Sequence, residues 1–220
     1  MESPLVYELR KPKHIDPNQI YPALFLMHGI GSNEKNMLHL VSGLEDKCYI
    51  FSIRGPISHP SGFAFFTIEG YGKPHLDVFD VAIQRLTGFL DYAARQYPID
   101  QKQLYLLGFS QGAILSMSLG LVLGSRIKGI VALSGYIPKF LREQEDTDVS
   151  GLEAFISHGE LDQVLPYEWG LEAKSFLKEK GASVTFRTYS DPHAVSPENQ
   201  KDYTEWLLTQ LENDKGGNGL

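Results

Sequence analysis

Short, continuous apolar runs recur along the chain, and such runs are typical of strands that are covered on both faces of a parallel sheet. These runs span residues 23–27, 49–53, 104–107, 127–133 and 152–157. Residues 5–10 predict a further short strand at an edge of the sheet, and residues 183–188 predict a last strand with alternating character.

Between these runs the apolar residues follow a helical spacing, which predicts helices with one buried face. The expected helices cover residues 33–44, 78–93, 113–117 and beyond, 167–178 and 197–211. Residues 57–74 are instead rich in turn-forming and aromatic residues. Loops of this length are usually functional in compact domains, so we expect a functional loop without regular structure there.

Strands that alternate with helices predict an α/β fold, with a mostly parallel sheet and helices on both faces. The length and composition are ordinary for one globular domain, which we place at residues 1–213. The glycine-rich residues 214–220 are expected to form a disordered tail.

Polar residues with catalytic potential come directly after several predicted strands. The residues in these positions are His28, Ser110, Asp162 and His193. In an open parallel sheet, ligands bind beyond the carboxyl ends of the strands. The recurrence of polar residues at these points therefore indicates chemistry at one edge of the sheet.

Residues 108–112 read Gly-Phe-Ser-Gln-Gly, between a predicted strand and a predicted helix. In that context G-x-S-x-G holds its serine on a tight turn, where the glycines let the neighbouring backbone pass close by. Peptide N–H groups at the start of the helix favour negative charge that develops on a substrate. Ser110 is therefore the candidate nucleophile, although the five residues alone also fit a simple connecting turn.

A serine hydroxyl needs a base that removes its proton and a third group that orients the base. Among the seven histidines, His193 is the best candidate base, because it lies in a short loop between the last strand and the last helix. In this type of fold the acid lies between the serine and the histidine along the chain. Asp162 occupies a loop in that interval, with Glu160 as its rival and Asp191 as a weaker alternative.

An oxyanion hole needs two preorganised backbone donors. The N–H of Gln111 directly follows the serine and supplies one, and the glycine-rich loop 28–31 supplies the other. We expect the second donor to be the N–H of Ile30, with Gly29 as the alternative. Short loops are expected to form the acyl-binding wall, and its candidate residues are Phe63, Phe65, Phe66, Tyr136, Ile137 and Leu165.

Composition and charge narrow the classes of partner. The formal net charge of −7 argues against nucleic acid or an anionic membrane surface as the main partner. The single cysteine, Cys48, cannot form a disulfide within the chain, which is typical of a cytoplasmic protein. No apolar run is long enough for a membrane span, so we expect no stable membrane insertion. We also expect no cofactor and no metal, and a monomer or a homodimer.

Several motifs together resemble the carboxylesterase/phospholipase family of α/β-hydrolases, which includes the acyl-protein thioesterases. They are His28-Gly29-Ile30-Gly31, Arg54-Gly55-Pro56, Gly108-Phe109-Ser110-Gln111-Gly112, His158-Gly159-x-x-Asp162-x-Val164-x-Pro166 and the terminal histidine. The resemblance covers roughly residues 23–211. It implies that Ser110, Asp162 and His193 form a catalytic triad. It also implies that the backbone N–H groups of Ile30 and Gln111 form the oxyanion hole.

Two positions depart from the pattern of that family. Ser32 stands where the family often has an acidic residue, and Pro192 precedes the histidine where the family often has glycine. The second change affects the conformation expected for the loop and leaves the base itself in place.

These features predict a serine carboxylesterase that hydrolyses small carboxylic esters through an acyl-enzyme intermediate. Residues 136–151 are too few for a lid, so we expect no cap domain and an open apolar cleft. One alternative is an acyl-protein or small-molecule thioesterase or lysophospholipase, which needs a longer acyl groove. The alternative from another class is a non-catalytic binding protein on the same fold.

Overall fold

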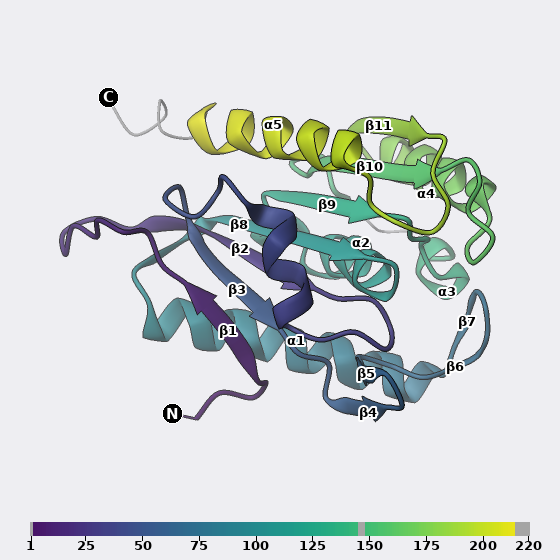
Figure 1. Ribbon diagram of the computed structural model, residues 1–220, viewed down its shortest axis with the longest axis horizontal. Coiled ribbons are helices and arrows are strands. Elements are labelled where there is room, and N and C mark those ends of the chain that lie inside the picture. Colours follow the sequence, from purple (N-terminus) through teal and green to yellow (C-terminus); the bar gives the residue numbers. More distant parts are fainter. Residues whose placement is uncertain (1, 145–147, 214–220) are drawn as a thin grey trace.

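The computed structural model describes residues 2–144 and 148–213, and the expected tail at residues 214–220 lies outside this part of the chain. A seven-stranded sheet with the order β1-β3-β2-β8-β9-β10-β11 forms its centre (Figure 1). β1 runs antiparallel to β3, and the other neighbouring strands run parallel. The strands are β1 (Tyr7–Arg10), β2 (Tyr21–Met27), β3 (Tyr49–Ile53), β8 (Ile99–Phe109), β9 (Gly129–Leu133), β10 (Glu153–Gly159) and β11 (Ser183–Tyr189). The prediction of a mostly parallel sheet is confirmed.

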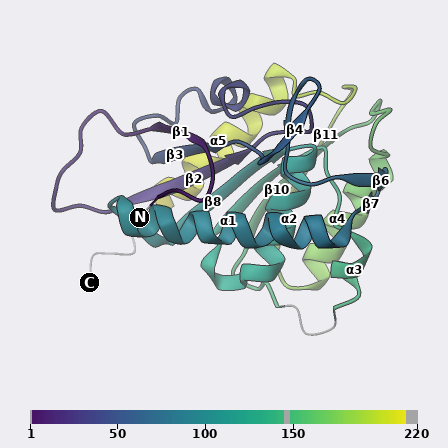
Figure 2. The same cartoon turned by 90° about the horizontal axis from the view of Figure 1, so that it is seen from below.

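Helices cover both faces of the sheet, as the alternation of elements predicts. One face carries α1 (Leu76–Gln96), α2 (Gln111–Leu123) and α4 (Tyr167–Glu179). The other face carries the 3₁₀ helix η1 (Lys35–Val41) and α5 (Pro197–Asn213) (Figure 2).

Strand β2 shows how the continuous apolar runs fill two cores. Successive side chains of a strand point to opposite faces. Phe25 and Met27 lie in the core under α1 and α2, whereas Leu24 and Leu26 lie in the core under η1 and α5. Each of these four side chains is at most 2% exposed. A polar residue at either set of positions would leave one layer of the molecule without packing.

Helix α2 begins directly after Ser110 and is packed into the centre of the molecule. Eleven of its thirteen residues are buried, which explains why its sequence is apolar on all sides. Two glycines permit this close packing. A side chain on Gly112 would overlap the carbonyl of Met27, and one on Gly108 would overlap the carbonyl of Gly112.

Two segments differ from the sequence-based prediction. The helix expected from residue 33 to residue 44 is the shorter 3₁₀ helix η1. Before its first turn the side chain of Asn33 accepts from the N–H groups of Lys35 and Asn36, and after its end the chain turns at Gly43 with a φ of 96°. The loop expected at residues 57–74 contains two small antiparallel hairpins. Their strands are β4 (Ile57–His59), β5 (Gly62–Ala64), β6 (Ile68–Gly70) and β7 (Lys73–Pro74), which are too short for a period of two to be visible.

The connection between β9 and β10 is short, as expected. Within its described residues, 134–144 and 148–152, it forms one helix, α3 (Lys139–Arg142). No cap domain covers the carboxyl edge of the sheet in the described part of the chain.

Candidate active site

Ser110 lies at the sharp turn between β8 and α2, at the carboxyl edge of the sheet. Its φ is 54°, a left-handed conformation that is costly for a residue other than glycine. The N–H of Ser110 donates to the carbonyl of Leu133 at 2.9 Å, and its own carbonyl accepts from Ala113 and Ile114 in the first turn of α2. The turn is thus held from both sides, and it leaves the hydroxyl at the edge of a cavity.

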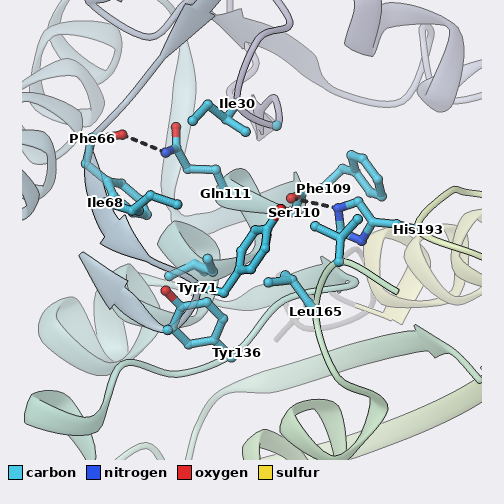
Figure 3. A pocket seen from close by; sticks show the side chains of 14 residues that line it. Ile30, Phe66, Ile68, Tyr71, Phe109, Ser110, Gln111, Tyr136, Leu165 and His193 are labelled. Carbon is cyan, nitrogen blue, oxygen red and sulfur yellow. Dashed lines mark hydrogen bonds between the residues drawn. The ribbon is translucent and has the colours of Figure 1, made fainter. Parts of the chain in front are cut away.

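His193 lies between Ser110 and Asp162 and contacts both. Its Nδ1–H donates to Oδ2 of Asp162 at 2.7 Å, which leaves Nε2 to accept from the Ser110 hydroxyl at 2.9 Å. The ring also packs on Phe109, with 4.9 Å between the ring centroids. The three residues follow the ends of β8, β10 and β11, and they form one hydrogen-bonded chain. Figure 3 shows its bond between Ser110 and His193.

The carboxylate of Asp162 is completely buried and has hydrogen-bond donors on both oxygens. The backbone N–H groups of Val164 and Leu165 donate to Oδ1 at 2.8 and 2.9 Å, while His193 donates to Oδ2. Burial alone would raise the pKa of Asp162, but these three hydrogen bonds outweigh it and hold the pKa below its ordinary value. Asp162 is therefore ionised in the neutral pH range, as a group that stabilises a protonated histidine must be.

Neither rival carboxylate reaches His193. Glu160 is exposed, and its nearest hydrogen-bond donor is the Ser190 hydroxyl at 3.5 Å. The side chain of Asp191 makes no hydrogen bond to the imidazole, although its backbone carbonyl accepts from the N–H of Leu161 at 3.1 Å. That backbone contact ties the loop of His193 to the loop of Asp162.

His158 is a buried residue at the end of β10 that contacts the same loop. Its Nε2–H donates to the carbonyl of Leu165 at 3.0 Å, and Nε2 lies 3.4 Å from Oδ2 of Asp162. Burial is the main cause of its pKa lying below the ordinary value, so the ring is neutral near pH 7. His158 thus acts as a hydrogen-bonding residue within its own loop.

The loop after β2 brings Gly29 and Ile30 next to the nucleophile. A side chain on Gly29 would lie 3.3 Å from Cβ of Ser110, so the glycine permits a close approach. The backbone N–H groups of Ile30 and Gln111 have no hydrogen-bond partner within residues 2–144 and 148–213. Free N–H groups beside a nucleophile are what an oxyanion hole requires.

His28 fixes this loop from behind. It is fully buried, its Nδ1–H donates to the carbonyl of Gly29 at 2.7 Å, and its Nε2 accepts from the N–H of Gly55 at 2.9 Å. Burial is the main cause of its lowered pKa, so this ring is also neutral near pH 7. A neutral ring with one donor and one acceptor is required for both contacts.

The side chain of Gln111 ties the catalytic turn to the segment at residues 65 and 66. Its Oε1 accepts from the N–H of Phe65 at 2.6 Å. Its Nε2 donates to the carbonyl of Phe66 at 2.8 Å, the bond drawn in Figure 3. The same residue thus presents its backbone N–H beside Ser110 and positions one wall of the adjoining cavity.

This cavity has a volume of about 180 Å³ and opens beside Ser110. We call it the acyl cavity because it lies where the sequence predicts the acyl-binding wall. Its apolar walls are formed by Phe66, Ile68, Tyr71, Phe109, Ile114, Tyr136, Val164 and Leu165. Three of the expected wall residues, Phe66, Tyr136 and Leu165, are among them.

Three other residues expected in the wall lie elsewhere. Phe65 is buried against the ring of His28, with 4.8 Å between centroids. Phe63 packs under the guanidinium of Arg54, which lies 4.5 Å from its ring centroid. Ile137 lines a neighbouring depression near Trp169.

The sequence reasoning also missed wall residues, of which Ile68 and Tyr71 come from the β6–β7 hairpin. Tyr71 is 63% exposed at the hairpin tip, and the backbone of the adjacent Gly72 is hydrogen-bonded to Tyr136. Burial raises the pKa of Tyr136 to about 12, so its phenol is neutral. Ile114 was predictable, because it lies one helical turn after Ser110.

The described residues contain no group of three or more His, Cys, Asp or Glu side chains that could hold a metal ion. None of the helices in the described ranges is long and apolar enough to cross a membrane.

The chain is similar to proteins of known family and structure. The model of the phospholipase/carboxylesterase family matches residues 16–211. The putative hydrolase MhqD of Bacillus subtilis is 27% identical over 83% of this chain and 90% of its own length. Acyl-protein thioesterase 1 of Candida albicans is 28% identical over 86% and 92% of the two chains. The crystal structure of the Bacillus cereus carboxylesterase superposes with a TM-score of 0.84 at 25% identity, over 94% of each chain.

Proposed function

The chain belongs to the phospholipase/carboxylesterase family of ester-hydrolysing enzymes and has its α/β-hydrolase fold, and we propose that it is a serine carboxylesterase. The observation that carries this proposal is the hydrogen-bonded chain from Ser110 through His193 to the buried carboxylate of Asp162. A non-catalytic binding protein would not need a strained serine aligned with a base.

In the proposed reaction, His193 accepts the proton of the Ser110 hydroxyl through Nε2 while the serine oxygen attacks the ester carbonyl. The charged imidazole is stabilised by Asp162, which stays ionised. The N–H groups of Ile30 and Gln111 would hold the oxyanion, next to the positive end of the α2 dipole. Loss of the alcohol yields an acyl-enzyme, and water that is activated by the same base releases the acid.

The dimensions of the acyl cavity favour short acyl groups. Its volume of about 180 Å³ is below the roughly 300–1,000 Å³ of pockets that hold drug-sized ligands. Its wall includes the rings of Tyr71 and Tyr136 (Figure 3) and the backbone of Gly72. We therefore propose esters with short acyl groups as substrates. The long acyl chains of acyl-protein thioesterase or lysophospholipase substrates would need a longer cavity.

The direct test combines kinetics with active-site labelling. The wild type is expected to hydrolyse p-nitrophenyl butanoate. A fluorophosphonate, an organophosphorus reagent that reacts with activated serines, is expected to label it at Ser110. Ser110→Ala should lose both properties. Failure of the fluorophosphonate to label the folded wild type would favour the non-catalytic alternative. Hydrolysis that is faster for palmitoyl than for butanoyl esters would instead favour a long-chain thioesterase or lysophospholipase.

A further inference from the structure

A second groove, the η1 groove, adjoins the acyl cavity at Phe109 and His193, which line both hollows. It runs between η1 and the residues that follow His193, and its volume is about 360 Å³. The two hollows share Gly29, Ile30, Phe109 and His193, so they adjoin each other beside the reacting centre. A substrate with its scissile bond at Ser110 can therefore extend in two directions.

The two hollows differ in the catalytic groups that they reach. The acyl cavity is lined by Ser110, Gln111 and His193 together. The η1 groove is lined by His193, whereas Ser110 and Gln111 are absent from its walls. The half of the substrate that becomes bonded to the serine must lie where the serine and the oxyanion donors are. The half that departs needs the histidine.

Proton transfer makes the same assignment. When the tetrahedral intermediate collapses, the bond between the carbonyl carbon and the leaving oxygen breaks, and its electron pair stays on that oxygen. The Nε2–H of the His193 imidazolium then gives its proton to the oxygen, which leaves a neutral imidazole, a neutral alcohol and the acyl-enzyme. The leaving oxygen must therefore lie on the His193 side, where the η1 groove begins.

The lining of the η1 groove indicates what kind of alcohol it takes. Among the described residues, no Asp, Glu, Lys or Arg lines it, so a charged head group would find no carboxylate, ammonium or guanidinium beside it. Its apolar part includes Met37 and Leu40, which are buried. Ser32, Asn36 and His39 add a hydroxyl, an amide and an imidazole, and Asn36 Nδ2 donates to Ser32 Oγ at 3.2 Å. Groups of this kind bind neutral hydroxyls.

We propose that the η1 groove is the leaving-group subsite and that it selects esters of neutral, hydroxyl-bearing alcohols such as polyols. This proposal rests on the proposed carboxylesterase function, since it assigns the two halves of that substrate. The η1 groove selects the alcohol half of the ester, whereas the acyl cavity selects the acid half.

The first experiment fills the groove. His39 is exposed on η1, and its backbone carbonyl, which the substitution keeps, accepts from Gln200 Nε2 at 2.9 Å. We expect His39→Trp to lower the ratio of kcat/KM for glyceryl monobutanoate to kcat/KM for ethyl butanoate by about tenfold, because the larger alcohol loses its space. The matched control is His14→Trp, at an exposed position outside both hollows, which should leave the ratio unchanged.

The second experiment tests the chemical class. Asn36→Leu keeps a side chain of similar size and removes the amide. The ratio of kcat/KM for glyceryl monobutanoate to that for n-butyl butanoate should fall by roughly fivefold, which corresponds to the loss of about one neutral hydrogen bond. An unchanged glyceryl-to-butyl ratio would overturn the assignment of a hydroxyl-bearing alcohol.

The third measurement separates this proposal from its opposite. If His39→Trp changes the preference between ethyl acetate and ethyl octanoate and leaves the glyceryl-to-ethyl ratio alone, the η1 groove holds the acyl group and the proposal is wrong. If ethyl butanoate hydrolysis depends on Ser110 while all three ratios stay unchanged in the variants, the proposed function stands and the leaving-group assignment fails.

Discussion

His158 and His193 approach the same oxygen of Asp162, at 3.4 and 2.7 Å, yet they differ in exposure and in their other hydrogen-bond partners. His193 is partly exposed beside the nucleophile, whereas His158 is fully buried and donates to the carbonyl of Leu165. A proton on His158 would place a second positive charge against the carboxylate that serves His193. The burial that keeps His158 neutral therefore keeps Asp162 available to one histidine.

This burial predicts a dependence of stability on pH. The pKa of His158 is lowered in the folded protein, mainly by burial, so below about pH 6.5 the unfolded chain binds a proton that the folded chain does not. The free energy of unfolding should therefore fall as the pH drops, by up to about 1.4 kcal/mol per pH unit for this residue.

Urea unfolding at several pH values between 7 and 5 measures this slope in the wild type and in His158→Gln. The variant should have the smaller slope, whatever its absolute stability. His28 is buried and neutral in the same way, so part of the slope remains. The exposed His14→Gln serves as the control. Equal slopes in the wild type and His158→Gln would show that His158 binds its proton equally well in both states.

Ser110→Ala should abolish turnover and leave the fold intact, because alanine fits the turn but carries no nucleophile. Loss of a triad member in other serine hydrolases lowers kcat by roughly 10⁴ to 10⁶. Steady-state hydrolysis of p-nitrophenyl butanoate measures the loss, and circular dichroism checks the fold. A variant that keeps a tenth of the wild-type rate would contradict the assignment of Ser110.

The geometry also predicts different outcomes for the two carboxylates of one loop. Asp162→Asn keeps the shape of the side chain but favours the wrong tautomer of His193, so kcat should fall by about 10⁴. Glu160→Gln alters an exposed group and should change kcat by less than about twofold. The same kcat assay decides between them, and the reverse order of the two effects would make Glu160 the acid.

Gln111→Leu should weaken the wall of the acyl cavity while it preserves the backbone N–H of that residue. The substitution leaves the buried N–H of Phe65 and the buried carbonyl of Phe66 without their hydrogen-bond partners on Gln111. Two unsatisfied groups cost about 2–6 kcal/mol, which should appear as a lower midpoint in urea.

The kinetic signature of Gln111→Leu is an altered preference between acetyl and hexanoyl esters, with a smaller loss of kcat than in Ser110→Ala. Gln84→Leu on the exposed side of α1 is the matched control for both measurements. An unchanged chain-length preference in a folded Gln111→Leu would mean that the side chain does not position the wall.

The sheet, the covering helices and the loops of Ser110, Asp162 and His193 could be predicted, because each loop follows a strand whose continuous apolar run is easy to detect. The wall of the acyl cavity was harder to predict from the sequence. Phe65 and Phe66 are adjacent at a bend after β5, where no strand or helix period applies. Phe66 lines the cavity and Phe65 packs on His28, and composition does not tell which of the two faces the cavity. The β6–β7 hairpin that brings Ile68 and Tyr71 to the site has strands of three and two residues, which are too short for an alternating pattern to predict them.

The burial of α2 has a consequence for how activity is lost. A helix that is enclosed on nearly every side cannot open by fraying, so its amide protons should exchange with solvent at the slowest, globally limited rate. The nucleophile stands at the first residue before this helix, whereas the β6–β7 hairpin at the rim has few buried contacts. On heating, the selectivity between substrates should therefore fall before the rate of hydrolysis by Ser110 does. That rate should be lost only when the whole molecule unfolds.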